Sequence, residues 1–504
     1  MVVRFSPADE GAWDYRITAN IERFAGKQGQ ITATPSDHPG FIRPANGHHW
    51  QTTETKQPHL WMGDTRKDFA SMPDAEFKTW LDGRAAQKFT HIRGYAMGQP
   101  WSSPDKPDVT FYKTLDDRLV QMNAKSIIAD LVLGQANDQL RKTFPNGAQR
   151  ERYITYIVSR YAAYNVTWQL VEEFEDYTDA RELMRQLGTQ LKNIDPYNHP
   201  RTTFAASTSA PLLADGWMDH VLDKSPDDDM GAIEHQLFAV PFVNAGIASS
   251  DDTEFRRRFW NATMNGQYPV VAETPTGAAK TISAWYELFS GSRFWEFEPY
   301  FDVDGARAIA LPGVEYIVYI EKPSGPIEVR LEKHGYDVEW INPVDGAITP
   351  AKNFKSERQA FDPPDTAHDW VLHIFREGRL QGMLKSWKFE SRPFLMQDIE
   401  TGITKIPYEI AQPSGDEISV SNPPKYAIKL KRETRGTRSM MYLWTGEVPS
   451  NGQGARVLGV GPAGTFRKHN VLFDNPEGVM TIRVYGMNAN GKVYLLDKIY
   501  RLTK

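Results

Sequence analysis

The sequence predicts a (β/α)8 TIM barrel of the α/β class with additional all-β sandwich domains. From about residue 47 to 304, short apolar runs alternate with amphipathic segments, as in βαβ units built on a parallel sheet. After about residue 305 the helical periodicity ends, and short strands separated by Gly, Pro and Asn follow. Two of the apolar runs in the first region end in a carboxylate, which is where barrel enzymes place their catalytic groups.

Eight segments of the barrel region have the character of strands, which is the number that a closed barrel needs. They lie near residues 59–64, 89–95, 126–133, 165–172, 201–206, 217–223, 268–273 and 293–297. Helical segments lie between them. Ser71-Met-Pro-Asp opens the first, and Tyr153, Ile157 and Tyr161 share one face of another.

The remaining residues divide into three β-rich parts. Residues 1–46 alternate in strand fashion but are too few to bury a core, so we interpret them as the C-terminal remnant of a sandwich with lead-in strands. Residues 305–382 and 383–504 each have the length of one sandwich, and Asn488-Ala-Asn-Gly marks a hairpin in the second. The expected domains are therefore 1–46, 47–304, 305–382 and 383–504.

Composition argues against several classes of function. The 504 residues carry a net charge of -6, with 58 basic and 64 acidic residues spread evenly, so no basic stripe is available for nucleic acid. The chain has no cysteine and hence no disulfide or thiolate chemistry. Aromatic residues make up 12% of the chain, including 14 Trp, which fits rings that stack on sugars as well as ordinary core packing.

No apolar run reaches the length of a membrane span, and the N-terminal residues lack the features of a signal peptide. Because the chain opens in what reads as the middle of a β-rich module, we expect that an upstream segment with an export signal precedes it. The expected location is therefore outside the cytoplasm of a bacterium, secreted or periplasmic, with a cytoplasmic location as the alternative. The sequence does not indicate an oligomeric state.

The two carboxylates that end apolar strands are Glu173, in Asn165-Val-Thr-Trp-Gln-Leu-Val-Glu-Glu173, and Glu273, in Pro269-Val-Val-Ala-Glu273. In a parallel barrel the carboxyl ends of all strands meet at one mouth, so both side chains are expected there. Hydrolysis of a glycosidic bond needs two carboxyl groups of this kind, one to protonate the leaving oxygen and one to attack the anomeric carbon or activate water. Glu173 and Glu273 are our catalytic candidates, against the alternative of solvated loop residues.

The barrel region resembles the apiosidase-like glycoside hydrolases. Leu60-Trp-Met-Gly-Asp-Thr65, followed by the segment from Arg84 to Arg93, resembles the opening of that family, whose first strand ends in a Gly-Asp-Thr signature. Residues 165–173 resemble the family's fourth strand and residues 269–273 its seventh. The resemblance implies that Glu173 is the general acid/base and Glu273 the nucleophile of a retaining hydrolase.

Two departures from that pattern concern substrate recognition. Relatives commonly have Gly-Gly-Asp, and the wider clan Asn-Glu, where this chain has Val171-Glu172-Glu173. Glu172 can accept a sugar hydrogen bond there but cannot donate one while ionised, and whether Glu172 or Glu173 is the acid/base stays open. Arg66 replaces a small residue beside Asp64.

Further candidates for sugar contacts are residues at or near predicted strand ends. Arg93 is expected either to clamp an acidic sugar or to form an ion pair with one of the glutamates. The full set of substrate-binding candidates is Asp64, Arg93, Tyr95, Trp168, Glu172, His235 and Trp295. For Asp64 the alternative is a loop cap, and for His235 and Trp295 it is ordinary packing.

Other catalytic arrangements find less support in the sequence. The histidines lack the paired spacing of a transition-metal site, and the chain has neither a Gly-x-Ser-x-Gly elbow nor a P-loop, so neither a metal nor a cofactor is expected. Asp227-Asp-Asp229 could hold calcium, although a solvated loop is the simpler interpretation.

The flanking modules carry resemblances of their own. The first residues resemble the last third of a sandwich that commonly precedes such barrels, and residues 305–382 resemble a sandwich named as a collagen-binding domain. No feature of the sequence indicates collagen binding, and support of the barrel is the simpler role.

The expected function is an exo-acting, retaining glycoside hydrolase that trims a plant, algal or bacterial polysaccharide. The alternatives are a non-catalytic carbohydrate-binding protein on a degenerate barrel and an endo-acting glycanase of the same clan.

Overall fold

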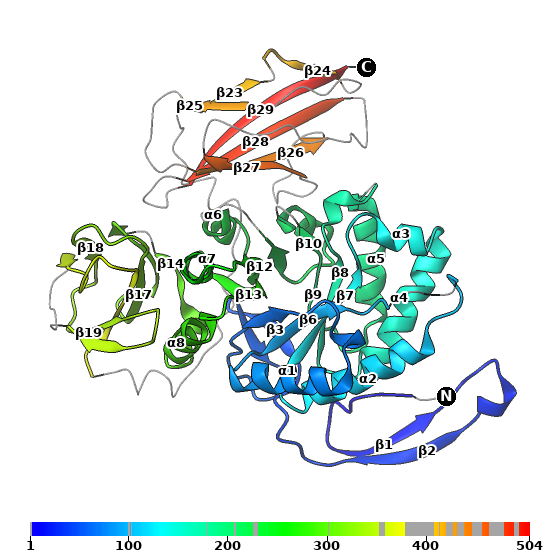
Figure 1. The fold of residues 1–504 in the computed structure, drawn as a ribbon. Helices are drawn as coiled ribbons and strands as arrows, with labels where there is room; N and C mark the ends of the chain where they lie inside the picture. Colours follow the sequence, from blue (N-terminus) through cyan, green and yellow to red (C-terminus); the bar gives the residue numbers. More distant parts are fainter. Residues whose placement is uncertain are drawn as a thin grey trace.

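The computed structural model describes residues 3–378 except 99–100, 102, 179, 206–207, 225–229, 301 and 352–357. Beyond residue 378 it describes residues 408–412, 414–419, 427–430, 438–445, 456–462, 478–487 and 493–503. These residues form a barrel, a β-sandwich beside it, and further sheets toward the C-terminus (Figure 1). The aspartates 227–229 and the hairpin signal at 488–491 lie outside the described residues.

The barrel is a parallel sheet with the strand order β10-β11-β12-β13-β5-β6-β7-β8-β9. Strand β9 pairs with β8 and β10 pairs with β11, and only Thr203 separates β9 from β10. The two segments therefore act as one fifth strand, and pairing of β13 with β5 completes a barrel of eight strand positions. The predicted TIM barrel is confirmed. The strands are β5 (Gly63–Thr65), β6 (His91–Tyr95), β7 (Ile128–Gly134), β8 (Val166–Val171), β9 (Arg201–Thr202), β10 (Phe204–Ala205), β11 (Val221–Asp223), β12 (Phe242–Ala248) and β13 (Gln267–Glu273).

One predicted barrel strand is wrong, and one real strand is absent from the prediction. Residues 293–297 contain a short 3-10 helix, η5 (Phe294–Glu296), and the strand after it joins the neighbouring sandwich. The seventh barrel strand is β12, whose sequence FVNAGIA mixes Asn, Ala and Gly with few β-branched residues and pairs irregularly with β13. Residues 267–273 therefore form the eighth strand and not the seventh.

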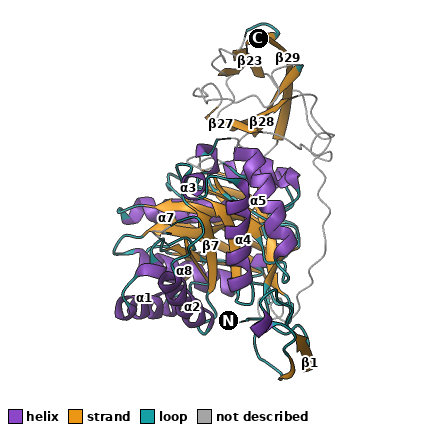
Figure 2. Ribbon diagram, turned by 90° about the vertical axis from the view of Figure 1, so that its right-hand side faces the viewer, coloured by secondary structure: helices purple, strands orange, loops and turns teal. Residues whose placement is uncertain are grey.

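Helices lie around the strands (Figure 2), and the described residues include eight α-helices. Helix α4 begins with a complete capping box between Asn146 and Gln149, and its buried face includes Tyr153 and Ile157, as the sequence pattern predicts. The helices are α1 (Asp74–Ala86), α2 (Val109–Asn123), α3 (Gln139–Thr143), α4 (Gly147–Tyr161), α5 (Ala180–Ile194), α6 (Met230–Leu237), α7 (Asp252–Met264) and α8 (Ala278–Ser290), with 3-10 turns η1 (Glu22–Phe24), η2 (Phe69–Ser71), η3 (Phe174–Asp176) and η4 (Ala210–Asp215).

Two hairpins precede the barrel. The first projects from the molecule (Figure 1) and the second pairs residues 42–45 with 49–52. Their strands are β1 (Gly11–Arg16), β2 (Gln28–Ala33), β3 (Ile42–Ala45) and β4 (His49–Thr52). Among the described residues, no helix is both long and apolar enough to cross a membrane.

The first sandwich begins at Glu298, a few residues before its predicted start at 305. Its six-stranded sheet has the order β14-β16-β17-β22-β19-β20, and a three-stranded sheet β15-β18-β21 accompanies it. Residues from both sheets, such as Tyr316 and Val329, share one apolar core. The strands are β14 (Glu298–Tyr300), β15 (Val303–Asp304), β16 (Arg307–Leu311), β17 (Glu315–Ile320), β18 (Ile327–Arg330), β19 (Tyr336–Ile341), β20 (Ile348–Pro350), β21 (Arg358–Phe361) and β22 (Trp370–Arg376).

The C-terminal part forms a five-stranded sheet, β24-β29-β28-β26-β27, and the pair β23-β25. Helix α6 of the barrel lies against β26 and β28 of this part. The strands are β23 (Tyr408–Gln412), β24 (Glu417–Ser419), β25 (Ala427–Leu430), β26 (Arg438–Thr445), β27 (Arg456–Pro462), β28 (Val479–Met487) and β29 (Val493–Thr503).

A buried histidine in the first sandwich makes its stability depend on pH. Burial alone would lower the pKa of His373, but hydrogen bonds of 2.8 Å to Glu315 and Glu339 outweigh burial and raise the pKa to about 9. Because protonated His373 is favoured in the folded state, it adds to the free energy of unfolding. This contribution is complete at pH values below about 6.5 and is lost as the pH rises through about 9.

We therefore expect the melting temperature of the sandwich transition to fall between pH 7 and pH 10, and the His373→Gln variant to be less stable at pH 7 with a flatter pH profile. A pKa of about 9 in place of 6.5 corresponds to a contribution of about 3 kcal/mol from His373 at low pH. Differential scanning calorimetry of both proteins measures this, with His334→Gln, a more exposed histidine of the same sandwich, as the control. Parallel pH profiles for wild type and His373→Gln would contradict the assignment.

Candidate active site

Strand register decides which side chains point into the barrel. Arg93, Asp130 and Thr167 lie side by side on β6, β7 and β8, and Tyr95 and Gln169 follow two residues later on β6 and β8. Because side chains alternate along a strand, these positions share the inner face of the sheet. Contacts agree with this, since Thr167 donates a hydrogen bond to Asp130 and Arg93 donates one of 2.7 Å to Gln169.

Glu172, directly after β8, is bound by three groups. Arg93 lies 2.9 Å from its carboxylate, the Tyr95 hydroxyl donates a short hydrogen bond, and the Lys67 ammonium lies 3.1 Å away. The side chain is buried with 4% of the residue exposed. Burial would raise the pKa of Glu172, but Arg93, Tyr95 and Lys67 together outweigh it and lower the pKa. We call Arg93, Tyr95, Gln169 and Glu172 the mouth cluster. The Glu172 carboxylate therefore stays ionised and is unsuited to act as an acid.

The contacts of Arg93 decide between its two expected roles, a clamp for an acidic sugar and an ion pair with a glutamate. Its guanidinium is 3% exposed, forms the ion pair with Glu172, and lies over the ring of Phe204 at 4.7 Å. The ion-pair alternative describes the structure, so Arg93 positions the glutamate and is not free to clamp an acidic sugar.

Glu173, the next residue, differs from Glu172 in backbone and surroundings. It adopts a left-handed conformation, with φ 46° and ψ 62°, which is costly for a residue other than glycine or asparagine. Its carboxylate lies 2.6 Å from the ammonium of Lys224, the residue after β11, and its side chain is 30% exposed. The turn therefore directs two adjacent carboxylates differently, one into a buried network and one toward solvent.

Glu273 is the last residue of β13 and is exposed. It lies beside Ala248 of β12, and the neighbouring loop is fixed by a hydrogen bond from the Gly277 amide to Asp252. Within the described part of the chain, the Glu273 side chain makes no hydrogen bond or ion pair. Since β13 is the eighth strand, the likeness of 269–273 to a seventh strand does not hold, and β12, the seventh, contains no carboxylate.

Two predicted sugar contacts point out of the barrel. Asp64 is aligned with Ile92 of β6, one residue out of phase with Arg93, and its carboxylate pairs with Arg84 of helix α1. Trp168 is aligned with Leu131, is fully buried in the core between strands and helices, and donates to Asp195 at 2.9 Å. Both expectations are corrected by the period-2 alternation of a strand, which places each side chain on the outer face.

His235 and Trp295 also lie away from the mouth. His235 is in the last turn of α6, before β12 begins, and contacts His48 and Glu298. Trp295 is in η5, and its backbone carbonyl accepts a hydrogen bond of 2.8 Å from Asn46. Neither contact belongs to the ends of the strands that carry Glu173 and Glu273.

Sequence reasoning did not identify Gln169, Asp130, Lys67 or Lys224, all of which contact or adjoin the mouth residues. Side chains alternate between the two faces of a strand, so the inner-face position of Arg93 and the register of β6, β7 and β8 together identify Asp130 and Gln169. Burial raises the pKa of Asp130 to about 6, a change that nearby Arg93 and Thr167 oppose. The two lysines lie in loops, and no spacing in the sequence indicates their contacts.

Comparisons with known proteins agree with the barrel fold. Residues 45–229 match the family model "Apiosidase-like, catalytic domain", which includes β5 to β11 and Glu173 but neither β12 nor Glu273. The chain is similar to the structure of a candidate glycoside hydrolase from Bacteroides vulgatus ATCC 8482, with 18% identity, a TM-score of 0.63, and coverage of 74% of this chain and 90% of that one. A glycoside hydrolase family 5 structure from the same organism gives 13% identity, a TM-score of 0.60, and coverage of 71% and 98%. No curated protein matches the chain.

Proposed function

We propose that this chain, a glycoside hydrolase with an Apiosidase-like catalytic domain over residues 45–229, cleaves a glycosidic bond in a plant, algal or bacterial polysaccharide by a two-carboxylate double displacement. Glu273 attacks the anomeric carbon, while Glu173, protonated, gives its proton to the leaving oxygen. Glu173 then removes a proton from water, which releases the sugar with its configuration retained.

The observation that carries this proposal is the contrast between neighbouring carboxylates at one end of the barrel. Glu172 is buried and held ionised by the mouth cluster, whereas Glu173 and Glu273 are open to solvent at the ends of the fourth and eighth strands. These two strands lie on opposite sides of an eight-strand barrel. The lowered pKa of Glu172 argues against that residue as the acid/base, because a carboxylate that is held ionised has no proton to give.

Lys224 has a defined part in this mechanism. Its ammonium lies 2.6 Å from the Glu173 carboxylate, and the proposal requires this exposed ion pair to open when Glu173 protonates the leaving oxygen. We propose that the enzyme is exo-acting and removes sugars from the end of a polymer. A polymeric substrate also agrees with the expected location outside the cytoplasm.

A panel of aryl glycosides and of pectic and arabinan-type polysaccharides tests the proposal, with wild type and Glu273→Gln assayed side by side. We expect wild type to release a single sugar, with the retained anomer appearing first by proton NMR. Glu273→Gln should keep its melting temperature and lose nearly all turnover. Full activity of this variant would refute the role of Glu273, and an inverted first product would refute retention.

Carbohydrate binding without turnover is the second candidate, favoured by the absence of a carboxylate from β12. It predicts that wild type and Glu273→Gln bind the same oligosaccharide with equal affinity while neither hydrolyses any member of the panel.

A further inference from the structure

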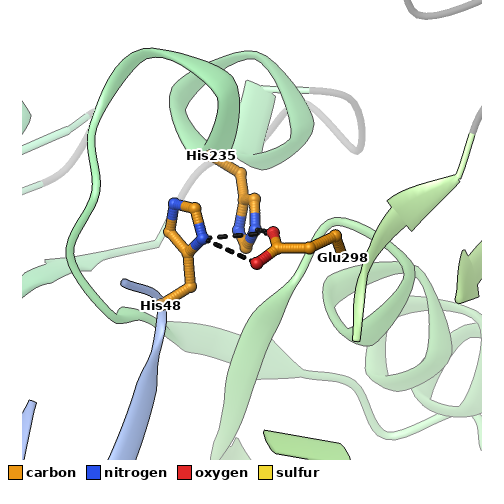
Figure 3. A group of neighbouring side chains, drawn as sticks. All are labelled: His48, His235 and Glu298. Carbon is orange, nitrogen blue, oxygen red and sulfur yellow. Dashed lines mark hydrogen bonds and ion pairs between the residues drawn. The ribbon is translucent and has the colours of Figure 1, made fainter. Parts of the chain in front are cut away.

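Three side chains from three separate parts of the chain meet away from the mouth. His48 lies in the turn between β3 and β4, His235 in the last turn of α6, and Glu298 is the first residue of β14 (Figure 3). Because α6 ends shortly before β12 begins, the group lies toward the N-terminal ends of the barrel strands. It joins the second hairpin, the barrel and the first sandwich.

The donor atoms of these side chains converge. Nδ1 of His48 lies 3.1 and 3.2 Å from the two carboxylate oxygens of Glu298, and Nε2 of His235 makes a short contact with the same carboxylate. All three donor atoms lie within 4.8 Å of one another. Tetrahedral zinc with bonds of about 2.1 Å separates its ligand atoms by about 3.4 Å, which is close to this spacing.

The orientation of His48 is fixed from outside the group. Its Nε2 lies 2.8 Å from the backbone carbonyl of Phe238, so this nitrogen carries the proton and Nδ1 is left facing Glu298. Metal-binding histidines commonly donate their second ring nitrogen to a carbonyl in this way.

The second imidazole is placed by close packing. The His235 ring stacks on the His48 ring, with centroids 3.5 Å apart and planes at 26°. Gly266 makes room for it, because a Cβ atom there would lie 2.4 Å from Nδ1 of His235. The histidines are 7% and 3% exposed, while the Glu298 side chain keeps 31% of its surface, which leaves an approach for an ion.

We propose that His48, His235 and Glu298 bind one divalent transition metal ion, zinc by the chemistry of the donors, with a fourth position for water. Two imidazoles and one carboxylate are a donor set that zinc accepts. The competing arrangement is a metal-free ion pair between protonated His48 and Glu298.

The position of the site assigns it a structural role. Each ligand comes from a different part of the chain, and none belongs to the mouth cluster or to the proposed catalytic pair. The ion ties the hairpin and the sandwich to the barrel and takes no part in hydrolysis.

Zinc titration of the metal-depleted full chain tests the proposal. We expect one zinc per chain by calorimetry and elemental analysis, and a rise in melting temperature of about 5 °C with zinc in excess. Cobalt in place of zinc should give the visible absorption of a tetrahedral site. Absence of stoichiometric binding by the wild-type chain overturns the proposal.

Variants locate the ion. His235→Gln and Glu298→Gln should lose the zinc-dependent rise, while His334→Gln, which changes a histidine of the same sandwich paired with Glu332, should keep it. Zinc binding that persists unchanged in the first two variants overturns the proposal. If those variants fail to fold, the stoichiometry and cobalt spectrum of wild type and His334→Gln still decide the question.

Discussion

Replacing Glu173 by Gln is expected to reduce hydrolysis of natural glycosides by about 10²- to 10⁴-fold, the usual contribution of a general acid/base. The loss should depend on the leaving group, because a dinitrophenolate departs without being protonated and needs no acid. Steady-state kinetics on a series of aryl glycosides measures this dependence. An equal loss on every leaving group would contradict the role of Glu173 as the acid.

Glu173→Gly separates catalysis from folding at the same position. Glycine adopts φ near +46° without the steric cost that glutamate bears, and the exposed ion pair with Lys224 contributes at most about 1 kcal/mol. We expect turnover to be lost while the melting temperature stays within about 2 °C of wild type or rises.

The matched control is Lys88→Gly, which relieves a similar conformation (φ 67°) at an exposed site after α1 and should leave activity unchanged. An unfolded Glu173→Gly protein beside a folded Lys88→Gly protein would show that Glu173 is structural.

Replacing Arg93 by Met is expected to lower the free energy of unfolding by about 3–5 kcal/mol, the usual effect of leaving a buried charge without its partner. Glu172 would keep only Tyr95 and the half-exposed Lys67, and Gln169 would lose its donor. The double variant Arg93→Met/Glu172→Gln should recover much of the loss. Denaturant unfolding of wild type, Arg93→Met, Glu172→Gln and the double variant gives the coupling free energy. If the double variant loses as much free energy of unfolding as the two single variants together, the coupling is contradicted.

The loss in free energy of unfolding caused by Arg93→Met should depend on pH in a predictable direction. In wild type the lowered pKa of Glu172 contributes stability that is present above its ordinary value near 4.5 and lost as pH falls through the folded value. In Arg93→Met the buried carboxylate gains a proton more easily, so the gap between the two proteins should narrow as pH falls. A gap that is constant from pH 7 to pH 4 would show that Arg93 acts through packing alone.

The barrel could be predicted from the sequence because most of its strands are continuous apolar runs that end in turn residues. The strand β12 could not, since Asn244, Ala245 and Gly246 have low strand propensity, and the register with β13 is interrupted between Asn244 and Ile247. Missing this strand moved the count by one and placed Glu273 on the wrong strand number.

The candidate site was predicted in part. Glu172, Arg93 and Tyr95, which the sequence indicated from strand ends, contact one another in the structure. The errors at Asp64 and Trp168 arise because a strand end specifies a level in the barrel but not a face, which depends on register with neighbouring strands. The group of His48, His235 and Glu298 has no signal in the sequence, because its members are up to 250 residues apart and meet only through tertiary packing.

The pairing of β13 with β5 has a consequence for biosynthesis. A Cβ atom at position 63 would lie 2.6 Å from the Val270 side chain, so glycine at this position lets β5 and β13 pack closely. We call the pairing of these first and last barrel strands the seam. As the ribosome releases the polypeptide, residue 173 emerges a hundred residues before residue 273, and the barrel can close only after β13 has followed. A nascent chain that stops short of β13 lacks the strand that pairs with β5, so its sheet stays open along this seam.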